Sequence, residues 1–162
     1  MTDLFLPPIE PATFSPCRTW RYRLERRWDG GPTVAFILLN PSTADETAVD
    51  PTIRRCIGYA QRWGFGALVV GNIFAFRSTD PKGLYRAPDP IGPDNDRWID
   101  RIAAGADRLI CGWGLHGAHQ DRGRTVACRL RPWRPMALSI TADGQPGHPL
   151  YLRADIEPKA FA

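Results

Sequence analysis

The chain has 162 residues, of which 43% are hydrophobic, which suits one domain with its own core. Its apolar runs are shorter than the roughly 18–20 residues of a membrane-spanning helix, and its acidic, proline-rich start lacks the order of a signal peptide. The net charge is +4, and all 21 basic residues except Lys82 and Lys159 are arginines. We expect a single cytoplasmic domain over residues 1–162, with residues 1–16 as an extended N-terminal segment.

The basic residues and the cysteines narrow the choice of partners. Arginine binds phosphate through a planar fork and stacks on bases, so the composition favours nucleic acid or a nucleotide as partner. A GC-rich genome explains the same bias equally well. The four cysteines form no C-x-x-C pair, which indicates buried free thiols and neither a zinc nor an iron–sulfur site. They are Cys17, Cys56, Cys111 and Cys128.

The first predicted elements are two strands. Residues 19–28 alternate between apolar and charged side chains, which predicts a half-buried strand with Arg21 and Arg23 on its open face. Glycines follow at 30–31, and residues 33–39 are continuously apolar, as in a strand that is buried on both faces. We expect these two strands to pair as an antiparallel hairpin.

The rest of the chain alternates between helices and buried strands. Asp50 and Pro51 are suited to cap and begin a helix that closes at Gly64. Further strands are predicted at 67–70, 108–111 and 135–140, further helices from Asp94 and over 120–130, and a long ordered loop over 77–93. This order predicts an α/β fold, a three-layer α/β/α sandwich with a mostly parallel four-stranded central sheet and the N-terminal hairpin beside it.

A polar or glycine-rich loop follows each predicted parallel strand. These loops begin at Asn40, Asn72 and Gly112, and the last contains His148. Ligands of open α/β sheets bind outside the carboxyl ends of the strands. We therefore expect the loops to build one site, which requires Asn40, Asn72 and His148 to lie close together.

The motifs in these loops resemble those of the uracil-DNA glycosylase superfamily. Asn40-Pro41 resembles the N-P of the G-[I/M]-N-P-G motif, and residues 70–77 resemble the T-N-V-V-K-x-R-P segment. Residues 107–114 are similar to the strand P-K-x-I-V-x-L-G, and residues 148–153 to H-P-[S/A]-x-L-L-R. The chain also resembles a bacterial and phage family of unknown function that is marked by L-N-P-S-T-A-D and H-P-L-Y.

The glycosylase resemblance implies roles for individual residues. His148 would stabilise the leaving base, and Asn40 and Asp45 would position the attacking water. The substrate-binding residues would be Pro41, Ser42, Asn72, Phe74, Arg77, Trp113 and Arg153. Each polar residue also has a structural explanation: Asn40 fits a turn, Asp45 fits the positive end of a helix, and His148 fits a loop beside proline.

Departures from the motifs limit what the resemblance implies. Phe76 and Asn95 or Asp96 stand where the iron–sulfur branch has cysteines, so we expect no cluster and no other cofactor. Ser42 replaces the last motif glycine, and the short segment after Arg153 leaves little room for a duplex-probing helix. His116 and His119 lack a clear third ligand, so a metal is not expected.

Three functions remain open at this stage, and the third is a different transferase or hydrolase on the same scaffold. The first is a monomeric nucleobase-binding enzyme that hydrolyses an N-glycosidic bond in a modified or damaged nucleotide or single-stranded nucleic acid, with no membrane partner. The second is a non-catalytic nucleic-acid or nucleotide-binding module on the same fold, since fold alone does not fix function.

Overall fold

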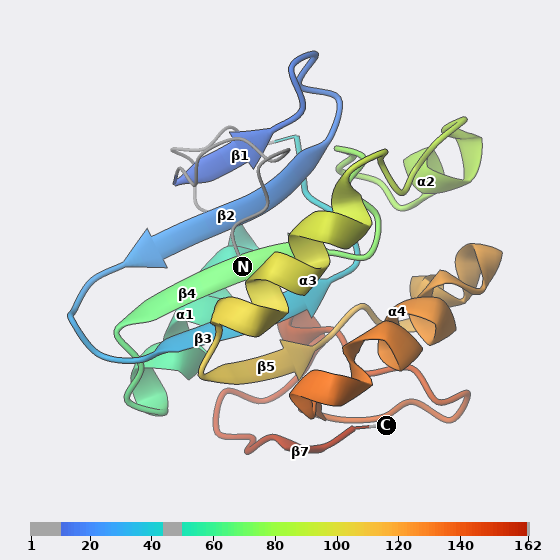
Figure 1. The fold of residues 1–162 in the computed structure, drawn as a ribbon. Coiled ribbons are helices and arrows are strands. Elements are labelled where there is room, and N and C mark those ends of the chain that lie inside the picture. Colours follow the sequence, from blue (N-terminus) through green and yellow to red (C-terminus); the bar gives the residue numbers. More distant parts are fainter. Residues whose placement is uncertain (1–10, 44–49, 162) are drawn as a thin grey trace.

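The computed structural model describes residues 11–43 and 50–161, and within them seven strands form one mixed sheet (Figure 1). The order across the sheet is β1-β2-β4-β3-β5-β6-β7. The strands are β1 (Ala12–Phe14), β2 (Arg21–Arg27), β3 (Thr33–Leu38), β4 (Ala67–Asn72), β5 (Arg108–Cys111), β6 (Met136–Ala137) and β7 (Lys159–Ala160).

The four inner strands β4, β3, β5 and β6 run parallel to one another. The α/β class is therefore correct, but the predicted four-stranded sheet is too small. Antiparallel strands β2 and β1 extend it beyond β4, and antiparallel β7 extends it beyond β6. The segment predicted as merely extended thus includes strand β1.

The predicted hairpin between β2 and β3 is wrong, because β4 lies between these strands. Val70 of β4 faces Leu24 of antiparallel β2 on one side and Phe36 of parallel β3 on the other. Each step between neighbouring strands is about 4.7–4.9 Å, and the connection from Trp28 to Pro32 is long enough to pass one strand position. Both ends are held to Gly66, the residue before β4, since Trp28 N donates to the Gly66 carbonyl at 3.0 Å and Gly66 N donates to the Pro32 carbonyl at 2.8 Å.

Helices cover both faces of the sheet. Helix α1 (Pro51–Arg62) packs on one face, and helices α3 (Asn95–Gly105) and α4 (Arg122–Leu130) pack on the other (Figure 1). The apolar positions of the inner strands alternate between the two resulting cores. Asp50 caps α1 as predicted, because its Oδ1 accepts a hydrogen bond from the Ile53 amide at 2.8 Å.

Shorter elements complete the described chain. The predicted loop over 77–93 contains a short helix, and the helix predicted over 120–130 begins only at Arg122, after a 3-10 segment. These elements are α2 (Lys82–Arg86), η1 (Leu115–Asp121), η2 (Arg131–Trp133) and η3 (Pro149–Tyr151). None of the helices in the described ranges is both long and apolar enough to span a membrane.

Two burial predictions need correction. Strand β2 is buried on both faces at its start, so Arg21 is only 3% exposed and does not lie on an open face. Strand β1 and the segment after β4 flank the start of β2 within the sheet, since Arg21 N donates to the Ala75 carbonyl and Arg21 faces Phe14 across the ladder. Of the four thiols, Cys56 and Cys111 are buried, but Cys17 and Cys128 are exposed.

Candidate functional site

A cavity of about 510 Å³ lies where the parallel strands end at their carboxyl side. The segments that follow β3, β4, β5 and β6 all contribute to its wall, as the topology predicts. Six of the predicted site residues line it: Asn40, Pro41, Ser42, Asn72, Trp113 and His148. Residues far apart in the sequence therefore share one cavity.

The other predicted site residues lie elsewhere. Phe74 is fully buried in the core on the α3 and α4 side, because the backbone after Asn72 turns its ring inward. Arg77 donates to the carbonyls of Arg18 and Thr43, which holds it away from the cavity lining. Arg153 is exposed and pairs with Asp155 at 3.3 Å. Asp45 lies outside the described residues.

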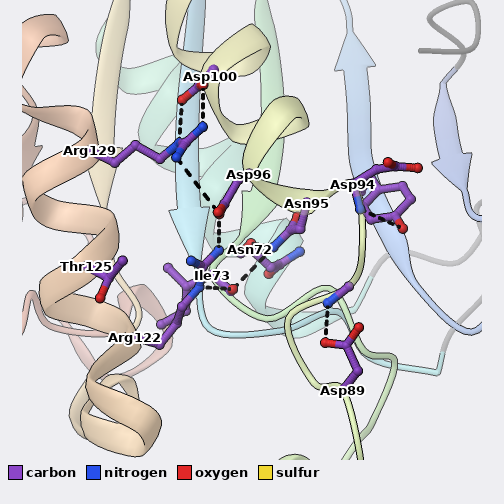
Figure 2. Close-up of polar contacts among 12 residues, drawn as sticks. Asn72, Ile73, Asp89, Asp94, Asn95, Asp96, Asp100, Arg122, Thr125 and Arg129 are labelled. Atoms are coloured by element: carbon purple, nitrogen blue, oxygen red, sulfur yellow. Dashed lines mark hydrogen bonds and ion pairs between the residues drawn. The ribbon is translucent and has the colours of Figure 1, made fainter. Parts of the chain in front are cut away.

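Asn72 presents an uncommitted side-chain amide to the cavity. The residue is 2% exposed, and its side chain hydrogen-bonds no other residue in the described part of the chain. Its backbone is fixed by Asn95, whose Nδ2 donates to the carbonyls of Asn72 at 2.8 Å and Ile73 at 3.2 Å (Figure 2). A fixed amide with both donor and acceptor is suited to pair with the edge of a nucleobase.

Asn40 is oriented by the loop after β4. Its Nδ2 donates to the carbonyls of Ser78 at 2.8 Å and Pro41 at 3.1 Å. The nitrogen is therefore occupied, and the side-chain oxygen remains as the polar atom available to a ligand or a water molecule. This amide links the ends of two neighbouring loops, so it shapes the cavity as well as lining it.

His148 has a defined tautomer and is neutral at pH 7. Its Nδ1 accepts a hydrogen bond from the Leu150 amide at 3.3 Å, so the proton of the neutral ring is on Nε2. Burial lowers the pKa of His148 below its ordinary value, and the nearby charge of Asp50 opposes this shift only in part. The ring is thus a neutral hydrogen-bond donor in a cavity wall.

Two glycines after β5 bring the His148 segment close to the sheet. A Cβ at Gly112 would lie 3.0 Å from Pro149 Cδ and 3.3 Å from a methyl group of Leu38. Gly114 has φ +73, a conformation that other residues rarely adopt, and its position lies beside the His148 side chain. The predicted glycine-rich loop therefore serves the close approach of the loop that carries His148.

Aromatic side chains occupy two different parts of the cavity. Trp113 is 1% exposed, and its Nε1 donates to Gln145 Oε1 at 2.7 Å, so the indole is a fixed part of the wall. Tyr151 is 83% exposed and also lines the cavity, with its ring centroid 5.6 Å from that of His148. Tyr151 was not predicted, and it presents an aromatic surface at the open side.

Arg21 and Asp50 are the charged lining residues that the sequence prediction did not assign to the site. The Nε of Arg21 is enclosed without a hydrogen-bond acceptor, and burial lowers the pKa of its guanidinium to about 10. Asp50 Oδ2 accepts from the Ser42 hydroxyl at 3.0 Å while Oδ1 caps α1. Strand alternation placed Arg21 on an open face, so the pattern gave no signal for it, whereas Asp50 follows directly from its position after the Asn40 loop.

The remaining histidines do not join in a metal site. His116 Nδ1 lies 2.9 Å from the Tyr85 hydroxyl, and the His119 ring packs against the ring of Tyr85 at 4.3 Å. Among residues 11–43 and 50–161, no three His, Cys, Asp or Glu side chains group closely enough to hold a metal ion.

The fold and the cavity define an α/β protein with a polar site at the carboxyl ends of four parallel strands. Residues 21–150 match the model of a family described as a protein of unknown function, DUF1643, and the chain belongs to this family. This agrees with the resemblance noted for the L-N-P-S-T-A-D and H-P-L-Y motifs. No curated protein and no solved structure matches the chain.

Proposed function

We propose that the protein is a nucleobase-binding enzyme that hydrolyses an N-glycosidic bond in a modified or damaged nucleotide or single-stranded nucleic acid. The observation that carries the proposal is the shared cavity of Asn40, Asn72 and His148. The order of their motifs resembles that of the uracil-DNA glycosylases, in which equivalent residues bind the base and position water. The volume of about 510 Å³ is in the range that encloses small organic ligands.

Base recognition depends on Asn72 and the aromatic residues. The uncommitted Asn72 amide offers one donor and one acceptor to the polar edge of a base. The wall formed by Trp113 and the exposed ring of Tyr151 provide apolar surface for its flat faces. A base within a duplex would have to be flipped out at about a few kcal/mol, so an unpaired base is the better substrate.

Hydrolysis exchanges the base at the anomeric carbon for a water molecule. The C1′–N bond breaks, its electron pair leaves with the base, and the water oxygen bonds to C1′ and releases one proton. The Nε2–H of neutral His148 donates a hydrogen bond to the anionic base, which then takes up a proton from the solvent. The Asn40 oxygen accepts a hydrogen bond from the water and orients it.

The state of Asp50 favours a second function, which is nucleotide binding without hydrolysis. Asp50 is the one carboxylate among the described residues that line the cavity, and both of its oxygens accept hydrogen bonds from the protein. Neither oxygen of this carboxylate is thus free of a protein donor. Under this alternative the cavity holds a base and releases it unchanged.

The test is base release from nucleotides and single-stranded oligonucleotides that contain uracil, hypoxanthine or other modified bases. We expect release by the wild type and a loss of about 10²–10³ in rate for His148→Ala, which removes the donor to the leaving base. His119→Ala is the matched control, because this histidine does not line the cavity. Binding of a base without release by the wild type would favour the second function, and equal rates for the two variants would contradict the role of His148.

A further inference from the structure

We propose that Arg21 forms an anion subsite inside the cavity, which receives the phosphate group of a nucleotide. This inference rests on the proposed function, because it names the charged part of the same ligand. Arg21 is only 3% exposed and lines the cavity. Its Nε is enclosed without a hydrogen-bond acceptor. The structure therefore contains a buried cationic group that the described protein does not neutralise.

A buried guanidinium without a partner is unfavourable in the free protein. A charge removed from water requires an ion pair or hydrogen bonds to offset its lost hydration. Within residues 11–43 and 50–161, Arg21 makes neither an ion pair nor a side-chain hydrogen bond. A ligand that brings a negative charge would supply the missing partner.

Charged side chains of both signs act on the Arg21 guanidinium. Asp50 attracts the guanidinium, whereas Arg77 and Arg26 repel it. Both carboxylate oxygens of Asp50 already accept hydrogen bonds, one from the Ile53 amide and one from the Ser42 hydroxyl. With a pKa of about 10, Arg21 is still protonated at pH 7. An anion in the cavity would therefore meet a protonated guanidinium.

The surrounding groups favour a phosphate over a carboxylate. The guanidinium is a planar fork that binds two oxygens of a phosphate at once. Thr52 lines the same cavity in the first turn of the 12-residue helix α1, whose amino end favours negative charge. A tetrahedral phosphate has enough oxygens for the guanidinium and the Thr52 hydroxyl together. The internal position of Arg21 suits a terminal phosphate rather than one within a continuous strand.

The experiment measures binding of inorganic phosphate by calorimetry and by the rise in melting temperature, with chloride at equal ionic strength as reference. Arg21→Met removes the guanidinium and keeps most of its apolar length. Arg23→Met is the matched control, because Arg23 is also buried in β2 but lies outside the cavity lining and pairs with Glu25 at 3.2 Å. We expect phosphate binding by the wild type and Arg23→Met, and at least about tenfold weaker binding by Arg21→Met. Unchanged binding by Arg21→Met would overturn the proposal.

A second measurement needs only the wild-type protein. Crystals soaked in tungstate, an electron-dense tetrahedral oxyanion, should show an anomalous peak within hydrogen-bonding distance of the Arg21 guanidinium. A cavity without such a peak would overturn the proposal even if Arg21→Met failed to fold.

A comparison of three ligands that contain the same base shows whether the phosphate belongs to a free nucleotide or to a strand. The ligands are a nucleoside, its 5′-monophosphate and a short single strand. We expect the monophosphate to bind at least about tenfold more tightly than the nucleoside, and this difference to vanish in Arg21→Met. Tighter binding of the strand than of the monophosphate would overturn the assignment to a terminal phosphate.

Phosphate binding that needs Arg21 without any base release would contradict the hydrolase and leave the subsite intact. Base release that is unaffected by Arg21→Met would contradict the phosphate subsite and leave the hydrolase intact.

Discussion

Arg122 Nε donates a hydrogen bond of 2.8 Å to the backbone carbonyl of Ile73, the residue that follows Asn72 (Figure 2). The same carbonyl accepts from Asn95 Nδ2, and the Arg122 guanidinium also pairs with Asp96 at 2.6 Å. The first turns of α3 and α4 are thus tied to the end of β4. This network, outside the cavity, fixes the backbone that presents the Asn72 amide.

Replacing Arg122 with methionine should therefore affect both stability and ligand binding. We expect Arg122→Met to lower the free energy of unfolding by roughly 1–3 kcal/mol, since a charge-assisted hydrogen bond and a largely buried cation are lost. Urea unfolding measures this change. Arg129→Met is the control, because its ion pairs with Asp100 and Asp96 are partly exposed and should contribute less than about 1 kcal/mol. Equal losses in the two variants, or unchanged base binding by Arg122→Met, would contradict a positioning role.

Arg21→Met should have the opposite effect on the free protein. Because the buried guanidinium is unpaired in the described structure, removing its charge should raise the free energy of unfolding by roughly 1–3 kcal/mol. The measurement is urea unfolding in a buffer without phosphate. Arg23→Met should be destabilised instead, because it leaves Glu25 without this partner. A destabilised Arg21→Met would show that the guanidinium has a structural partner.

The lowered pKa of His148 predicts a pH-dependent stability. Below the unfolded value of about 6.5, the unfolded chain binds a proton that the partly buried ring of His148 resists. The contribution of neutral His148 to the free energy of unfolding is therefore fully present above that pH. It is lost as the pH falls towards the lower folded pKa, by at most about 1.4 kcal/mol per pH unit. His148→Gln should lack this loss, so the difference between the two unfolding curves should change between pH 7 and 5. Curves that stay parallel would show that His148 does not titrate differently on folding.

The four thiols should separate into two reactive and two protected groups. Hydrogen bonds with Ser15 and Thr19 lower the pKa of the exposed Cys17 thiol to about 7, whereas burial raises the pKa of Cys56 and Cys111. Cys17 should react with iodoacetamide at pH 7 several times faster than the exposed Cys128. Peptide mass mapping of the labelled protein measures the two rates. Cys56 and Cys111 should react only after unfolding. Early labelling of Cys56 would contradict the described packing.

The sequence predicted the strands and their order along the chain better than their pairing. Strand β4 and helix α1 follow from local patterns, because burial on two faces and an Asp50 cap leave clear signals. The position of β4 between β2 and β3 left no signal in the sequence, since a glycine turn after β2 fits a hairpin and a longer connection equally well. Pairing is decided by contacts between distant segments, which periodicity does not contain.

The site shows the same division. Asn40, Asn72 and His148 were expected together because parallel strands direct their carboxyl ends to one edge, and all three line the cavity. Phe74 was misplaced, because a loop position does not reveal on which side of the backbone a ring packs. Arg21 was missed, because alternation identifies two faces of a strand but not whether the second face is also buried in the fold.

The central place of β4 has a consequence for how the chain folds. On one side of β4 lies the antiparallel pair β1 and β2, and on the other lie β3, β5, β6 and β7. A nascent chain that has emerged only as far as α1 holds β2 and β3 with no ladder between them, so two open edges must wait for the next segment. Synthesis of Ala67–Asn72 is the event that joins the halves, and the same six residues deliver Asn72 to the cavity.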